Sequence, residues 1–396
     1  MLMKRFGWLV LLMLVASPGW AAKKITVEQL KQMLTSMQAA GKSDADVVAA
    51  LKDVELGEEL TTPMMDSFSS LVPGQLTTEQ LYILEIRSAI LPPPAADIPS
   101  APAPDAAAQK AILDKTFEYA SKTYAQLPAV TATKVERRFQ DNAQINPGSV
   151  GAHSTAVVAG PTPPIRYSGS NDYSVTFKNG AEENPLAKEK THWGDNGLIA
   201  LLGQQPVLST VLAEAQAGGK INFVRWESVY GHQTAVFSFA VDKKKTHYAV
   251  NYCCFPEDTD AADQDLNMRG GVGPVAGGAS ASTQPGGNSQ GNYMKNANWK
   301  PVKATVPYHG EFFVDPNTGI VVRLITVADF KSSELVRQED QRIDYAVETV
   351  GDKSLVLPVR DIVETLELPY GDSVQGRQTL RHTLFTSAYK NYQAGS

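Results

Sequence analysis

The sequence FFVDPNTGIVVR, residues 312–323, has the pattern of a strand, a turn and a second strand. Within the turn, Asp315 starts the bend, Pro316 fixes φ and Gly319 supplies a left-handed position. Apolar runs on both sides of so short a turn are typical of two strands that pair antiparallel. We therefore expect an antiparallel sheet at the centre of the fold.

Similar runs lie on either side of this unit. Short stretches rich in β-branched and aromatic residues, each ending in turn residues, predict further strands. We expect strands at residues 173–178, 221–229, 233–241, 246–252, 305–314, 320–328, 335–348 and 353–365. Because these strands follow one another while helical patterns lie mostly before them, the expected fold class is α+β with a curved, mostly antiparallel sheet.

Two amphipathic helices are expected to cover this sheet, at residues 107–127 and 197–217. Each gathers Leu, Ile, Val or Phe on one face, so both would lie across the same side of the strands. An apolar space between a curved sheet and two helices is a typical ligand site. The residues expected to line it are Trp193, Leu201, Leu208, Leu212, Phe223 and Trp226.

The second helix follows the sequence HWGDNG at residues 192–197, in which Asp195 or Asn196 would be the N-cap. One interpretation places His192 and Trp193 at the mouth of the ligand cavity. The other, which we favour, makes Trp193 an aromatic plug of the core beside a helix cap.

Residues 25–91 carry the start and stop signals of four short amphipathic helices. Capping boxes at Thr26–Gln29 and Thr77–Gln80 are expected to begin the first and the fourth. Ser43 would cap the second, and Thr62-Pro63 would begin the third with proline at the first helical position. These signals predict a compact helical module, a unit that usually acts as a scaffold or docking surface.

Proline and alanine dominate residues 92–108, which follow the module. Repeated prolines favour extended polyproline II, so we expect a semi-rigid linker that tethers the module as a docking arm. The β-rich domain would then occupy residues 109–396. Within it, residues 269–292 are rich in Gly, Ser and Ala and are expected to form a flexible insertion between strands.

The first residues have the order of a cleavable secretory signal. A basic start is followed by an apolar run at residues 6–16 and by the small residues Gly19 and Ala21. We expect residues 1–21 to be the signal peptide and the mature protein to be periplasmic or secreted. The run is too short to span roughly 30 Å of hydrocarbon, so no transmembrane segment is expected after cleavage, and an uncleaved anchor is the alternative.

The composition argues against one class of partner. Hydrophobic residues make up 43% of the chain and charged residues 20%, which is ordinary for a globular protein, and the formal net charge is −6. The sequence has no basic stripe that could meet phosphates, so nucleic acid is not an expected partner.

The sequence contains no catalytic, cofactor or metal motif. It lacks a nucleophile elbow, a Walker loop, a dinucleotide-binding glycine pattern and a zinc motif, and its six histidines are scattered. The acidic residues at 257–265 lack the spacing of an EF-hand and are expected to form a solvated loop. Cys253 and Cys254 are adjacent, which strains a mutual disulfide, so two buried thiols are expected.

Several stretches carry a resemblance to known proteins. They are FVRWESVYGH at 223–232, GEFFVDPNTG at 310–319, IDY at 343–345 with LPVR at 357–360, and the closing FTSAYKNY at 385–392. Together with the helical module, they resemble an uncharacterised family of exported proteins from soil bacteria, which implies export but no activity. More loosely, a helix that leads into a run of antiparallel strands is similar to the lipoprotein carrier and sensor superfamily (LolA, LolB, RseB). That resemblance implies a half-barrel sheet that holds acyl chains, and it carries over no site residue.

Three hypotheses about function follow. The first is a non-enzymatic exported envelope protein that binds a lipid-like ligand or a lipoprotein under the curved sheet. The second is a structural or interaction protein with a packed core and no ligand, whose partner is an envelope protein. The third and least favoured is an enzyme, which would need His192, Asp195 and other polar groups to meet in one cleft. Side chains that fill the space between helices and sheet would favour the second hypothesis over the first.

Overall fold

The computed structural model of the chain describes residues 23–141, 165–183, 200–201, 207–256, 299–331, 336–367 and 381–395. The expected signal peptide, the acidic stretch, the Gly-rich insertion and most of the sequence around Trp193 lie outside these ranges. Within the described ranges, no helix combines the length and the hydropathy that a membrane span requires.

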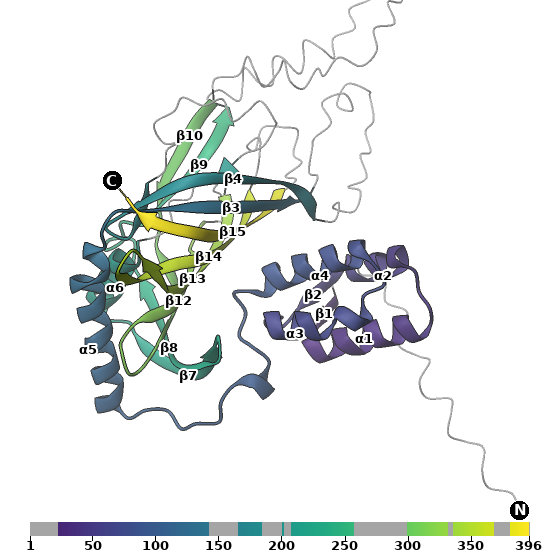
Figure 1. Ribbon diagram of the computed structural model, residues 1–396, viewed down its shortest axis with the longest axis horizontal. Helices are drawn as coiled ribbons and strands as arrows, with labels where there is room; N and C mark the ends of the chain where they lie inside the picture. Colours follow the sequence, from purple (N-terminus) through teal and green to yellow (C-terminus); the bar gives the residue numbers. More distant parts are fainter. Residues whose placement is uncertain are drawn as a thin grey trace, which may run out of the picture.

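A ten-stranded antiparallel sheet forms the body of the molecule and follows the N-terminal helices (Figure 1). The expected α+β class is therefore confirmed, although the sheet is neither closed nor strongly curled. Its strand order is β5-β4-β3-β15-β14-β13-β12-β11-β8-β7, so β5 and β7 are the edges. The strands are β3 (Val130–Gln140), β4 (Arg166–Lys178), β5 (Ala181–Glu183), β7 (Asn222–Val229), β8 (His232–Val241), β11 (Tyr308–Val314), β12 (Val321–Ala328), β13 (Val336–Val350), β14 (Lys353–Glu367) and β15 (Arg381–Ala394).

A second, three-stranded sheet has the order β10-β9-β6. It consists of β6 (Ala200–Leu201), β9 (Ala249–Pro256) and β10 (Trp299–Thr305), and Figure 1 shows β9 and β10 as a ribbon that stands away from the main sheet. The expected helix at 197–217 is therefore wrong in its first half, because Ala200 and Leu201 pair with β9. Helix α6 (Leu208–Gly218) begins only after Pro206. Proline lacks the N–H of a helical hydrogen bond and clashes with the preceding turn, so apolar spacing across it does not make one helix.

Helices α5 (Ala106–Lys122) and α6 lie on the same face of the main sheet, as expected (Figure 1). Alternate residues of the central strands point toward them and form the largest apolar core. Phe237 of β8 and Phe312 of β11 stack there with ring centroids 5.6 Å apart. Ile112 of α5 and Leu212 of α6 are buried in the same core.

The N-terminal module packs on the opposite face of the sheet and has its own apolar core (Figure 1). Its elements are β1 (Lys23–Ile25), α1 (Val27–Ala39), α2 (Asp44–Leu51), β2 (Val54–Leu56), α3 (Thr62–Ser67) and α4 (Gln75–Ser88). β1 and β2 pair in parallel, which the sequence patterns did not predict. Residues of α4, Ile83 and Ile86, contact Ile362 and Leu384 of the sheet in a third apolar cluster.

Helix caps explain where the module's helices begin. Thr26 forms the expected capping box, and Ser43 is the expected N-cap, where Asp46 completes a second capping box. The expected box at Thr77 is wrong, because α4 begins earlier and is capped by a residue of another helix. The Asp44 carboxylate of α2 accepts hydrogen bonds from the backbone N–H groups of Leu76 and Thr77 at 3.0 and 2.9 Å and from the Thr77 hydroxyl at 2.6 Å.

The linker at residues 92–108 is attached to both bodies of the structure. Near its start, the carbonyl oxygen of Pro92 accepts a hydrogen bond of 2.8 Å from the backbone N–H of Glu59 in the module. Further along, the carbonyl oxygen of Pro102 accepts one of 2.8 Å from the indole N–H of Trp226 on β7. The linker is therefore hydrogen-bonded to the module near its start and to the sheet near its end.

The turn between β11 and β12 forms as the sequence predicts. The Asp315 carboxylate accepts a hydrogen bond of 2.9 Å from the backbone N–H of Asn317, and Gly319 has a φ of 77°. The same turn contacts α5, where the Lys115 ammonium donates a hydrogen bond of 3.2 Å to the carbonyl oxygen of Asn317. A Cβ on Gly319 would lie 2.7 Å from the backbone carbon of Lys115, so glycine is needed here both for conformation and for space.

We expect Gly319→Ala to destabilise the protein more than Gly351→Ala, its matched control. Gly351 also has positive φ, at 65°, but a Cβ added there would meet nothing within 4 Å, so that variant loses only the conformational freedom of glycine. The clash with α5 should cost Gly319→Ala about 1–3 kcal/mol more. Urea unfolding of both variants measures the difference, and equal losses would contradict this role of the turn.

Candidate functional site: the junction of module and sheet

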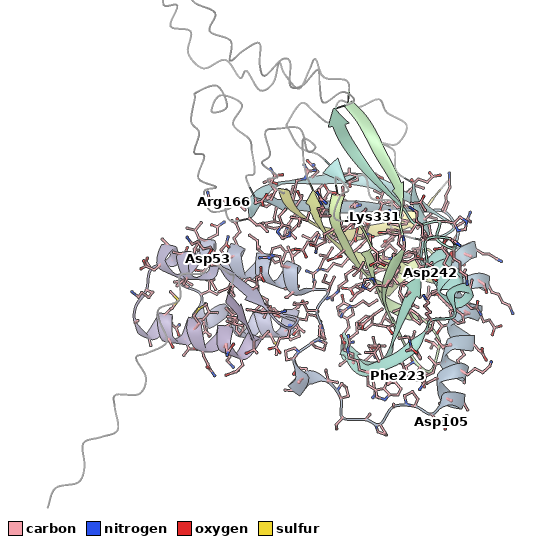
Figure 2. The ribbon with its side chains drawn as sticks, turned by 180° about the vertical axis from the view of Figure 1, so that it is seen from behind. Asp53, Asp105, Arg166, Phe223, Asp242 and Lys331 are labelled. Carbon is pink, nitrogen blue, oxygen red and sulfur yellow. The ribbon has the colours of Figure 1, made fainter. Side chains whose placement is uncertain are left out.

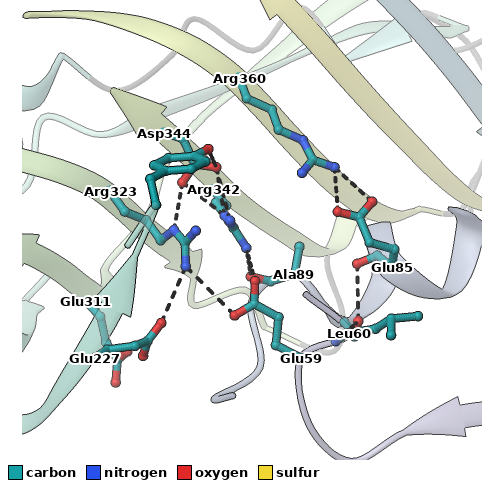
Figure 3. A network of polar contacts seen from close by, with 12 residues as sticks. Glu59, Leu60, Glu85, Ala89, Glu227, Glu311, Arg323, Arg342, Asp344 and Arg360 are labelled. Atoms are coloured by element: carbon teal, nitrogen blue, oxygen red, sulfur yellow. Dashed lines mark hydrogen bonds and ion pairs between the residues drawn. The ribbon is translucent and has the colours of Figure 1, made fainter. Parts of the chain in front are cut away.

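Arg342 of β13 joins the module to the sheet (Figure 3). Its side chain is only 5% exposed, and its guanidinium donates hydrogen bonds to the Glu59 carboxylate at 2.5 Å and to the carbonyl oxygen of Ala89 at 2.9 Å. On the sheet it donates to the Asp344 carboxylate at 3.0 and 3.2 Å. One buried cation is thus bonded to both bodies.

Asp344 is the centre of the network and has no exposed surface. Besides Arg342, it accepts a hydrogen bond of 2.6 Å from Arg323 of β12 and one of 3.0 Å from the Tyr230 hydroxyl. Arg323 also lies 3.5 Å from Glu227 and 3.8 Å from Glu59 (Figure 3). The β7–β8 turn and strands β12 and β13 therefore meet at one carboxylate, and Arg342 connects this carboxylate to the module.

Two further arginines extend these contacts. Arg225 of β7 donates to Glu227 at 2.8 Å and to Glu311 at 3.0 and 2.9 Å. Arg360 of β14 donates to both carboxylate oxygens of Glu85 on α4, at 2.9 and 2.8 Å. The arginines all come from the sheet, whereas the module contributes acids.

Burial and pairing act in opposite directions on these groups. Burial raises the pKa of Asp344, but the guanidinium groups of Arg323 and Arg342 outweigh it and hold that pKa well below the usual value of 3.8. A depressed pKa adds stability that is present above the pKa of the unfolded chain and is lost as pH falls toward the folded one. For Glu85, burial is the larger effect and raises the pKa despite the neighbouring Arg360.

We expect Arg342→Met to lower the free energy of unfolding by about 3–5 kcal/mol, because it leaves Glu59 and Asp344 buried without their main partner. It should also divide the unfolding transition, with the module separating first. Arg166→Met, at the exposed start of β4 (Figure 2), is the control and should change stability by no more than about 0.5 kcal/mol. Guanidinium chloride unfolding followed by circular dichroism measures both, and similar curves for the two variants would contradict the bridging role.

Beside the network, the module and the sheet enclose a cleft of about 420 Å³. Lys24, Glu55 and Arg87 line it from the module, and Gln338, Glu364 and His382 line it from the ends of β13, β14 and β15. Leucine and isoleucine side chains of both bodies complete its walls. The cleft is therefore part apolar and carries charges of both signs.

The charged groups of the cleft are less completely paired than those of the network. Arg87 lies 3.5 Å from Glu55 and 3.9 Å from Glu364, and its buried Nε has no hydrogen-bond partner among the described residues. The His382 ring is hydrogen-bonded to Glu364. Next to Gln338, one oxygen of the buried Asp340 carboxylate also lacks a partner within the described chain.

The residues expected to line a lipid cavity lie elsewhere. Leu208 and Leu212 of α6 are each 1% exposed within the main core. Phe223, labelled in Figure 2, and Trp226 lie on β7 at the border of that core, with their ring centroids 5.4 Å apart. Leu201 lies in β6, and Trp193 is outside the described residues. The four placed side chains thus contact one apolar cluster.

A buried acid lies on the helix-covered face of β13. Glu339 accepts a hydrogen bond of 3.0 Å from the Tyr248 hydroxyl, and its other oxygen has no hydrogen-bond partner among the described residues. Burial, together with the charges of Asp340 and Asp361, raises the pKa of Glu339 to about 8. The folded protein therefore holds a proton there that the unfolded chain releases above about pH 4.5.

Because this folded pKa is raised, stability should fall as pH rises from about 5 to about 8. Glu339→Gln, which mimics the protonated form, should make this decline shallower. The exposed Glu28→Gln on α1 is the control and should keep the wild-type slope. Urea midpoints measured across this pH range test the expectation, and parallel curves for Glu339→Gln and the wild type would contradict it.

The sequence patterns did not identify the junction residues. Arg323, Arg342, Asp344 and Arg360 each have at least one apolar neighbour along the strand, which is also what a strand with one solvent-exposed face shows. The one pattern that could have indicated buried ion pairs was the presence of opposite charges at alternate positions of neighbouring strands. Their partner Glu59 is 283 residues away from Arg342 in the chain, beyond the reach of any local pattern.

The described residues contain no group of His, Cys, Asp and Glu side chains arranged to hold a metal ion. No protein-family model, curated protein or solved structure matches this chain. The resemblance to exported proteins of soil bacteria and to the lipoprotein carriers therefore stays a prediction.

Proposed function

We propose that this protein is a non-enzymatic, exported interaction protein with a packed core, in which module and sheet act as one rigid body. The observation that carries the proposal is the filled layer between α6 and the sheet. Leu208 and Leu212 lie there with the stacked Phe237 and Phe312. Interiors packed in this way leave no room for a ligand without displacing side chains.

The junction supports a binding role rather than a catalytic one. The arginines of the network are bonded to the carboxylates of the same network, so these groups are engaged in holding the structure together. A buried pair of this kind adds little net stability and instead fixes how two surfaces meet. The consequence is one continuous surface, built from the module and the sheet, that keeps its shape when a partner binds.

Export rests on the signal pattern of residues 1–21, which predicts a periplasmic or secreted protein whose partner is another envelope protein. The alternative is a lipid carrier in which the sheet forms a LolA-like half-barrel. That function would require α6 to lift away from the strands, since Leu208 and Leu212 occupy the place of an acyl chain.

Delipidated full-length protein should show no saturable uptake of a fluorescent fatty acid, because Leu208 and Leu212 are packed against Phe237 and Phe312 in the layer between α6 and the sheet. A fluorescence titration measures uptake, with Leu212→Trp as a matched variant that adds volume to the same layer. Weak, unsaturated signals of equal size in both proteins are the expected result. Stoichiometric uptake that palmitic acid competes away and Leu212→Trp abolishes would overturn the packed-core proposal in favour of the carrier.

A further inference from the structure

Arg87 in the junction cleft has unused hydrogen-bonding capacity. A guanidinium has five N–H donors, and it pairs most favourably with a carboxylate through two parallel hydrogen bonds. Arg87 instead has two long ion pairs, at 3.5 and 3.9 Å, and its buried Nε donates to no described residue. The exposed Lys24 lines the same cleft and adds a second cation.

On the sheet side, Glu364 lines the same cleft together with His382, to which it is hydrogen-bonded, and Asp340 is the cross-strand neighbour of Glu364. Asp340 of β13 and Glu364 of β14 are directly paired across the two strands, so two carboxyl groups lie next to each other. Asp340 is 6% exposed and retains one oxygen without a hydrogen-bond partner in the described chain. Burial, together with the charge of Glu364, raises the pKa of Asp340 to about 6. A cation placed here would stabilise the charged form of the Asp340 carboxylate and reduce its repulsion by Glu364.

The remaining walls are apolar. Leu56 and Leu84 of the module and Leu366 of the sheet are among the residues that line the cleft. A volume of about 420 Å³ lies within the range of small-molecule sites, roughly 300–1,000 Å³. Apolar walls with a few convergent charges favour a ligand that is itself amphipathic.

We propose that the cleft binds a small zwitterion with apolar side chains, of the class of short apolar peptides, whose carboxylate pairs with Arg87 and whose ammonium pairs with Glu364. A ligand with a single negative group would leave Asp340 and Glu364 facing each other. A divalent cation would meet Arg87 and Lys24 and be repelled by them. Only a ligand with both charges and an apolar body matches all three sets of groups.

The test uses the full-length protein and three probes: leucyl-leucine, its N-acetyl derivative and its C-terminal amide. Isothermal titration calorimetry should show saturable 1:1 binding of leucyl-leucine, and blocking either end should weaken it at least about tenfold. Arg87→Gln should weaken the binding of leucyl-leucine but leave the binding of the amide unchanged, since the amide has no carboxylate. Glu364→Gln should weaken the binding of leucyl-leucine but leave the binding of the N-acetyl derivative unchanged, since that derivative has no ammonium group.

Controls separate binding from folding. Lys52→Gln, at an exposed position at the end of α2, should bind like the wild type, and Arg87→Lys should keep part of the affinity because it keeps the charge. Thermal unfolding of each variant checks that it is folded. No binding of leucyl-leucine up to about 10 mM, or equal affinities for Arg87→Gln and Lys52→Gln, would overturn the proposal.

Discussion

A buried arginine must find all of its acceptors inside the protein, and Arg342 finds them on two separate bodies. Without Glu59 and Ala89 of the module, the Arg342 guanidinium would either be exposed to solvent or stay buried without enough partners, and an unpaired buried charge costs several kcal/mol. Without the sheet, Glu59 would lose the cations that allow it to be buried. Apolar contacts such as those of Ile83 and Ile86 with the sheet provide attraction, since each buried side chain contributes about 1.5–3 kcal/mol. The buried charges determine how the module is positioned on the sheet when these apolar contacts form.

The sheet is covered on both faces, and this changes the meaning of its alternating pattern. Along β13, Ile343 points into the core under α5 and α6, while its neighbours Arg342 and Asp344 point toward the module. In a sheet with one wet face, the charged positions of such a strand would be solvated and energetically neutral. Here the charged side chains are buried, so each needs ion-pair and hydrogen-bond partners in defined positions, just as the apolar side needs close packing. The turn at Gly319, which contacts α5, is the corresponding constraint on the other face.

Local signals predicted those parts of the fold that local chemistry decides. The capping box at Thr26, the N-cap at Ser43 and the turn at Asp315 formed as expected, because each depends on residues only a few positions apart. β3 and β15 were missed, since polar residues at their buried positions hide the apolar period. Lys134 of β3, for example, is buried because it pairs with Glu182 at 3.1 Å. The start of α4 was misplaced for a similar reason, as its cap comes from another helix, and the junction site depends entirely on such distant pairs.

Two positions of the same strand pair explain why the network ends where the cleft begins. At Asp344 and Arg360, β13 and β14 place opposite charges side by side, and the module closes over them with Glu59 and Glu85. Four residues earlier along β13, at Asp340 and its partner Glu364, the same strands place like charges side by side. The module does not close there, and its nearest cation, Arg87, remains 3.9 Å from Glu364. Without a ligand, the raised pKa of Asp340 offers partial relief, because a proton taken up near pH 6 removes one of the two charges. The module therefore closes over the pair of opposite charges at Asp344 and Arg360, and it leaves a cleft beside the pair of like charges at Asp340 and Glu364.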